Sequence, residues 1–159
     1  MDVKEVQGRP VVTIATGEKI GEVDDVVVDG QDRRVAAFRI SSGGFLSRQH
    51  HYLPFGAIKT IGDDAVMIQT ADALQQSYGD RADGYFTLDT LTKLRVVTQS
   101  GTYIGDIASA RFDPATGQIT DFEVGTGGIF RSNTIVGPDS VISIGSDIIV
   151  IVDTTTAAS

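Results

Sequence analysis

Short runs of apolar residues, separated by glycine, proline and polar turns, recur along the whole chain. Most of these runs alternate apolar and polar positions, which is typical of β-strands with one buried face. The pattern predicts a first short strand over residues 10–14, a longer strand over 20–28 and a third over 34–41. Only residues 71–78 have the composition of a short helix, of about two turns, that stops at Gly79. The pattern therefore indicates an all-β fold.

The stretch from Gly17 to Asp29 recurs 84 positions later, from Gly101 to Asp113. The same offset matches many apolar, glycine and proline positions: Val35 with Ile119, Phe38 with Phe122, Gly43-Gly44 with Gly127-Gly128, Pro54 with Pro138 and Ile58 with Ile142. An offset held over so many positions is the signature of an internal repeat. The sequence therefore predicts two copies of one small β-module.

The repeated strand is predicted to contain a β-bulge. In a regular strand Val23 and Asp25 would share a face, yet Val26 and Val28 clearly belong to the same apolar set. The second copy is apolar at the positions that match the three valines: Ile107, Ala110 and Phe112. The inward-facing phase therefore shifts by one residue between 23 and 26, as a bulge requires.

Each module is expected to form a small β-barrel of five or six short antiparallel strands. The predicted domains are residues 1–70 for the first module, 71–86 for a linker with a short helix or turn, 87–153 for the second module and 154–159 for a frayed tail. Six residues are expected to set the turns and kinks: Gly17, Gly21, Asp29, Gly101, Gly105 and Asp113. Modules of this size have marginal cores, so the two would gain by packing together.

The last strand of the second module, residues 148–152, is apolar at every position, unlike residues 65–69 in the first. A strand that is apolar on both faces is usually covered on both. We therefore expect its outer face, carried by Ile148, Val150 and Val152, to pack against the first barrel or against another subunit. A homodimer is one form of the second arrangement.

Large apolar residues also follow the two glycine pairs: Phe45-Leu46 in the first module and Ile129-Phe130 in the second. The topology puts both in loops, and exposed apolar patches often mark partner sites. With the flanking Arg48 and Arg131 they form a candidate partner-binding surface. The alternative is that these tips fold back to plug the barrel ends or to bridge the barrels.

Composition and charge narrow the classes of function. The net charge of the 159 residues is −8, and no cluster of Lys and Arg argues for direct contact with nucleic acid or anionic lipid. With no cysteine there is no disulfide or thiolate nucleophile. The N-terminus lacks the pattern of a signal peptide, and residues 148–152 are too few to span a bilayer, so we expect a soluble cytoplasmic protein.

The candidate chemical groups are few. His50 and His51 are the only histidines, and adjacent strand residues point to opposite faces, so they cannot easily bind one ion together. The acidic turns lack the loop pattern of a calcium site, and the glycine pairs lack the Lys-Ser/Thr of a phosphate loop. No nucleophile with a base is evident. We therefore predict no catalytic residues, no metal site, no cofactor and no enzyme activity.

The pattern Gly17-x-x-x-Gly21-x-Val23-x-Asp25-Val26-x-x-Asp29, followed by Val35-x-x-Phe38, resembles the PRC-barrel family. Leu53-Pro54-Phe55-x-Ala57-Ile58 and the turn at 61–64 extend the resemblance. It covers residues 5–70 well and 88–152 more loosely, because Ser109 stands where Asp25 does and Asp139 where Phe55 does. The family includes the cytoplasmic domain of the photosynthetic reaction-centre H subunit and a domain of a ribosome-maturation factor. The resemblance implies a β-barrel adaptor.

Two functions are compatible with these observations. The first is a non-catalytic adaptor or scaffold that binds a protein partner or another copy of itself. The alternative is a ligand- or ion-responsive module that uses the acidic turns or the groove between the barrels. A role in RNA processing is disfavoured by the net charge, and would have to act through a protein contact.

Overall fold

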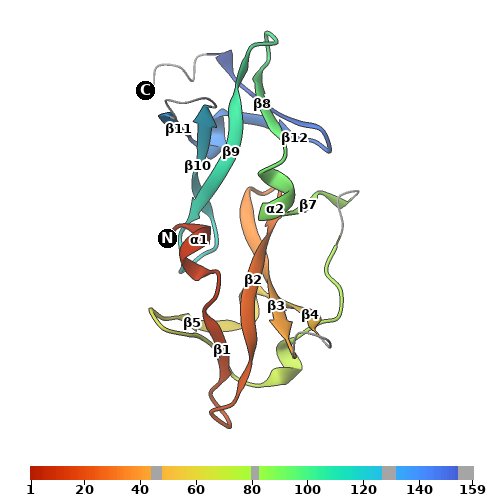
Figure 1. Ribbon diagram of the computed structural model, residues 1–159, viewed down its shortest axis with the longest axis vertical. Coiled ribbons are helices and arrows are strands. Elements are labelled where there is room, and N and C mark those ends of the chain that lie inside the picture. Colours follow the sequence, from red (N-terminus) through yellow and green to blue (C-terminus); the bar gives the residue numbers. More distant parts are fainter. Residues whose placement is uncertain (44–47, 80–82, 127–131, 154–159) are drawn as a thin grey trace.

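The computed structural model describes residues 1–43, 48–79, 83–126 and 132–153, which form two β-sheets in tandem, one of seven strands and one of six (Figure 1). The strand order is β4-β3-β2-β1-β6-β5 in the first sheet and β11-β10-β9-β8-β13-β12 in the second. The two orders correspond strand for strand, so the sequence repeat is a structural repeat. The prediction of two β-modules in tandem is confirmed.

The first module contains β1 (Pro10–Thr13), β2 (Lys19–Asp29), β3 (Arg34–Ser42), β4 (Gln49–Pro54), β5 (Ile58–Ile61) and β6 (Val66–Ile68). The second contains β8 (Arg95–Thr98), β9 (Tyr103–Phe112), β10 (Ile119–Thr126), β11 (Ser132–Val136), β12 (Val141–Ile144) and β13 (Ile148–Ile151). The short helices are α1 (Val3–Val6), η1 (Phe55–Ala57), η2 (Ala71–Ala73), α2 (Leu88–Leu91) and η4 (Pro138–Ser140). No helix in the described part of the chain is long and apolar enough to cross a membrane.

One strand pair in each sheet is parallel, which corrects the prediction of antiparallel strands only. β1 pairs with β6 and β8 pairs with β13 in this way. The reason lies in the connection between β4 and β5, where η1 carries the chain from one edge of the sheet to the other without reversing it. The β5–β6 hairpin then returns alongside β1 in the same direction.

The predicted bulge is present in both modules. The β2–β3 register skips a residue between Val23 and Asp25, and the β9–β10 register skips at the matching place.

The strand registers also show that the repeat offset of 84 residues does not hold along the whole module. Phe38 pairs with Leu53 and Phe122 with Val136, so the counterpart of Ile58 is Val141 and not Ile142. The second module is one residue shorter in the loop after β10.

Two predicted glycines lie where neighbouring strands approach most closely. A Cβ atom on Gly21 would lie 2.6 Å from the carbonyl oxygen of Ser41, and one on Gly105 would lie 2.4 Å from that of Gly125. No other residue fits at such distances, so both glycines let the long strands β2 and β9 bend against their partners. Gly17 and Gly101 lie in the preceding turns at positive φ, 72° and 93°.

The predicted turn aspartates accept hydrogen bonds within their own turns. Asp29 Oδ1 accepts from the backbone N–H groups of Gln31 and Asp32, at 2.9 and 3.1 Å. Asp113 Oδ1 accepts from the N–H of Ala115 at 2.8 Å. These contacts close the β2–β3 and β9–β10 hairpins, which face the other module.

The segment between the modules differs from the two helical turns that residues 71–78 were expected to form. Only η2 is helical, and Gln75 then pairs with Tyr52 of β4 through two backbone hydrogen bonds of 2.7 and 2.8 Å. These bonds to a sheet edge use the N–H and C=O groups that a longer helix would need. The segment therefore covers the edge of β4.

The N-terminal segments of the two modules are exchanged. β7 (Tyr85–Thr87) precedes the second module in sequence, yet it pairs with β2 of the first. Met1 precedes the first module, yet its amino group donates to Phe112 O of β9 and its carbonyl accepts from Phe112 N. Figure 1 shows α1 and α2, which continue these segments, at the waist of the elongated molecule.

The two modules share one hydrophobic core. Phe112 of the second module packs between Phe38 and Phe55 of the first, with edge-to-face ring centroids 6.4 Å from each. Phe38 and Phe55 lie 6.2 Å apart. All buried apolar side chains of the described residues except two, Val27 and Ala37, belong to a single cluster that runs through both sheets. The junction is therefore made by strand ends and exchanged segments.

Candidate functional site

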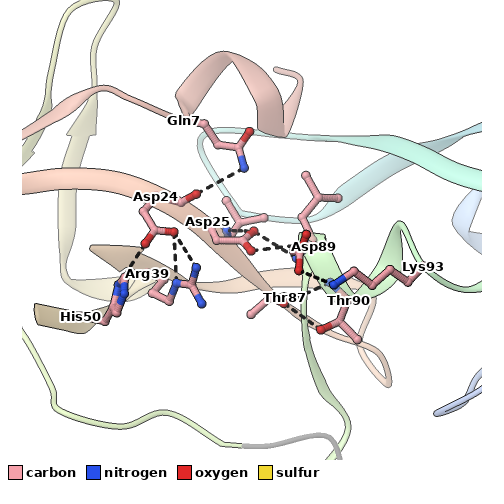
Figure 2. A network of polar contacts seen from close by, with 11 residues as sticks. Gln7, Asp24, Asp25, Arg39, His50, Thr87, Asp89, Thr90 and Lys93 are labelled. Atoms are coloured by element: carbon pink, nitrogen blue, oxygen red, sulfur yellow. Dashed lines mark hydrogen bonds and ion pairs between the residues drawn. The ribbon is translucent and has the colours of Figure 1, made fainter. Parts of the chain in front are cut away.

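A polar cluster lies on the outer surface of the first module, next to the bulge in β2 (Figure 2). Asp24 Oδ1 accepts from Arg39 Nη2 at 2.7 Å and from Arg39 Nε at 3.1 Å. Its other oxygen lies 3.0 Å from Nδ1 of His50. Partial burial lowers the pKa of Arg39, but the hydrogen bond and charge of Asp24 outweigh it, so the pKa is raised overall.

Because of the bulge, the side chain of the next residue, Asp25, points into the protein and not toward its outer surface. Asp25 is 2% exposed, and its side chain accepts from the N–H groups of Val26 at 2.7 Å, Leu88 at 3.1 Å and Asp89 at 3.4 Å. Two of these donors belong to the first turn of α2, which Thr87 also caps. Burial raises the pKa of Asp25, and the hydrogen bonds oppose the rise. Asp25 therefore holds the start of the second module to the first.

The second module joins its long strand to the exchanged segment by a different contact. Ser109, at the position of Asp25, donates to the carboxylate of Asp2, which caps α1 through the N–H of Lys4. In the first module the strand carboxylate of Asp25 accepts from backbone N–H groups of α2, and the hydroxyl of Thr87 caps α2 separately by accepting from Thr90 N. In the second module the strand supplies a hydroxyl and the segment supplies the carboxylate. The substitution of Asp25 by Ser109 thus has a structural explanation that sequence comparison alone did not supply.

The Asp24–His50 pair has the geometry of an orienting carboxylate and an imidazole. Catalysis would also need a nucleophile, and no serine or threonine hydroxyl of the described residues hydrogen-bonds to His50. The second module carries Ala108, Glu123 and Asn133 at the matching positions, where Asn133 donates to Glu123. Among the described residues no three His, Asp or Glu side chains cluster closely enough to hold a metal ion.

The second module carries an exposed apolar face on the strands β9, β8 and β13. Tyr103, Val97 and Val150 lie opposite one another across β9, β8 and β13. Ile148 lies next to this row, opposite Arg95, whose guanidinium carbon is 4.8 Å from the centre of the Tyr103 ring. Tyr103 is 48% exposed and Ile148 39% exposed. We call Tyr103, Val97, Val150 and Ile148 the module-2 face.

The first module is more polar at the same positions. By strand register Lys19 stands where Tyr103 does, Met67 where Val150 does and Ala65 where Ile148 does. Lys19 pairs with Glu22 at 2.7 Å, whereas Tyr103 donates to Asp106 at 2.9 Å and leaves its ring exposed. The exposed Tyr103 and Ile148 are therefore particular to the second module, whereas Val97 and Val150 have apolar counterparts in the first, Val12 and Met67.

The side chains predicted to form a covered outer face on the last strand, Ile148, Val150 and Val152, are only in part buried. Ile149 and Ile151 point into the core, while Ile148 is exposed and Val150 and Val152 are partly buried. The junction with the first module is formed by other elements, so the first barrel does not cover Ile148. The alternative, contact with another subunit, stays a prediction.

The predicted tip surface lies mostly outside the described residues. Phe45, Leu46, Ile129, Phe130 and Arg131 all fall in the undescribed segments. Arg48 is described, is exposed and lines a shallow groove with Lys19, Glu22 and Ser42.

Two grooves lie between the modules, at equivalent places of the repeat. One, of about 430 Å³, is bounded by the β2–β3 turn with Arg33 and by β12. The other, of about 330 Å³, is bounded by the β9–β10 turn with Pro114–Thr116 and by β5. The sequence predicted an inter-barrel groove but not that it would be present twice.

Two sheets of corresponding strand order with exchanged N-terminal segments define a tandem β-barrel protein. The model of the PRC-barrel domain matches the chain twice, over residues 1–75 and 83–157. The chain therefore belongs to the PRC-barrel family, as a tandem protein. No curated protein matches it.

Proposed function

We propose that this protein is a non-catalytic adaptor that binds a protein partner, or another copy of itself, through the module-2 face. The supporting observation is that Tyr103 and Ile148 expose apolar surface on this face, where the first module has Lys19 and Ala65. Exposed apolar patches on monomers commonly mark interaction sites. Localisation in the cytoplasm is part of the same proposal.

The experiment replaces the module-2 face with the residues of the first module. The double variant Tyr103→Lys, Ile148→Ala carries the counterparts Lys19 and Ala65, so the fold already accepts these residue types at these positions. We expect it to lose the partner that the wild type captures by cross-linking, or to lose self-association in sedimentation velocity. Ile14→Lys is the matched control, because Ile14 is a 50% exposed isoleucine on the first module.

If the double variant and the control retain the same assembly, the module-2 face is not the binding surface. The tip prediction is tested in the same assay by Phe45→Ser together with Phe130→Ser. A protein that assembles normally with both sets of changes would contradict the adaptor proposal.

A ligand-responsive module is the second candidate, and the two inter-barrel grooves favour it. A ligand that binds only the folded state raises the melting temperature. A screen of calcium and small metabolites by thermal shift tests this function, and a shift that Arg34→Ala or Ile142→Ala abolishes would locate the ligand in one groove.

A further inference from the structure

β5 is an open sheet edge. It ends the first sheet, and no described residue pairs with its outer side. Two of the other three sheet ends are occupied. Gln75 pairs with β4, and Arg33 Nη2 donates to the carbonyls of Val141 and Ile142 on β12, at 2.7 and 3.2 Å. An unpaired edge is a template for another strand.

The internal repeat explains why β5 is open while β12 is not. β12 is the counterpart of β5, and Arg33 reaches it from the turn of the opposite module. The counterpart of Arg33 in the other turn is Gly117, which has no side chain to reach β5. Arg33 has a φ of 51°, a conformation that favours glycine, and Gly117 has a φ of 80°. The β2–β3 turn of the first module therefore blocks the edge of β12, whereas the equivalent β9–β10 turn of the second module leaves the edge of β5 accessible.

The 330 Å³ groove runs along this open edge. All four residues of β5 line it on one side, and Pro114–Thr116 line it on the other. Phe55, Ile58 and Ile61 give it an apolar floor. A chain lying in it would have β5 beside its backbone and the turn of the second module against its side chains.

The charged residues of the groove are both basic. Arg34 and Lys59 line it and no carboxylate does, although the whole protein has a net charge of −8. Arg34 Nη2 donates to Thr116 O at 3.0 Å, which fixes that guanidinium at the wall of the groove. Lys59 lies on the strand itself and is exposed. A lysine on an edge strand discourages pairing in general, and its charge favours a strand that places a carboxylate opposite it.

We propose that β5 is a strand-addition site for an extended acidic peptide segment of a partner protein. The backbone of the peptide would pair with the open edge of β5, and its acidic side chains would meet Lys59 and Arg34. This site belongs to the first module and does not depend on the module-2 face.

The test measures the affinity of a fluorescein-labelled peptide of alternating Glu and Val by fluorescence anisotropy. A peptide of alternating Lys and Val is the charge control, and the amide resonances of the protein locate the binding site. We expect the acidic peptide to shift the backbone amide resonances of Ile58–Ile61 and the basic one not to. N-methylation of the peptide amides that would face β5 should weaken binding about fivefold for each hydrogen bond removed.

The protein variant is Lys59→Glu, matched by Lys4→Glu, which changes the net charge equally at an exposed lysine on α1. We expect about five- to tenfold weaker binding for Lys59→Glu alone, because an ion pair becomes a like-charge contact. Three outcomes would overturn the proposal. The two variants could weaken binding equally, the N-methylated peptide could bind as tightly as the unmodified one, or the amide shifts could lie only outside β5. The double variant Tyr103→Lys, Ile148→Ala, which alters the module-2 face, should bind the acidic peptide as the wild type does.

Discussion

Asp25 and Ser109 occupy the same place in the two modules, yet the chemistry by which they join the modules differs. Asp25 brings a buried carboxylate to three N–H donors, and Ser109 brings a hydroxyl to the carboxylate of Asp2. Burial raises the pKa of Asp25, so the ionised form is less favourable in the fold than in the unfolded chain. The single residue therefore couples the stability of the junction to pH.

We predict that Asp25→Asn removes this pH dependence. Because the pKa of Asp25 is raised in the fold, the folded state binds more protons between about 3.9, the unfolded value, and the raised value. The free energy of unfolding of the wild type, relative to the Asn variant, should fall as the pH rises through this range. Chemical denaturation of both proteins at several pH values measures the difference. A difference that stays constant, or rises with pH, would contradict the raised pKa.

The exchanged segments are the elements that join the modules. β7 adds a strand to β2 across Val27–Asp29, and Phe86 on β7 is 3% exposed. Phe86 lies against Gly30, where a Cβ atom would be 3.0 Å from its ring. A segment that leads into the second module is thus buried in the first, and neither sheet has its complete set of neighbours without the other.

Phe86→Ala is expected to destabilise the protein by about 3–5 kcal/mol, because a large side chain is removed from a packed position. The loss should be detectable in β2 of the first module, although Phe86 precedes the second in sequence. Amide hydrogen exchange of β2 measures it. Tyr85→Ala is the control, since Tyr85 is the neighbouring, partly exposed residue on the same strand. Faster exchange confined to the second module would argue against the exchanged arrangement.

At the scale of the whole molecule, one core unites two repeats. The Phe38–Phe55–Phe112 cluster lies at the junction, and the buried apolar residues of both sheets are continuous with it. Modules of this size bury a small fraction of their surface and have marginal cores. The tandem arrangement therefore provides a core that neither module has by itself.

We predict that the full chain unfolds in a single cooperative transition, and that Phe112→Ala lowers the stability of both modules together by about 3–5 kcal/mol. Circular dichroism and amide resonances from each sheet should report the same midpoint in urea. Two separate midpoints in the wild type would mean that the modules are independent.

The sequence by itself determined the repeat, the β-class, the bulge and the family, because these depend on local periodicity and on glycines that admit no other residue. The bulge between 23 and 26 could be read from a phase shift in apolar positions, and Gly21 from its repetition at Gly105. The turn aspartates Asp29 and Asp113 were likewise visible as local hydrogen-bonding residues.

Tertiary structure alone decided which segments pair across the modules. The parallel β1–β6 pair, the exchange of β7 and the role of Arg33 depend on contacts between residues far apart in the chain, and such contacts leave no periodic signal. The apolar last strand illustrates the limit. Its composition predicted two covered faces, and cover of the outer face by another subunit stays a prediction. Ile149 and Ile151 point into the core, but the first module does not cover Ile148, because the exchanged segments and Phe112 form the junction elsewhere.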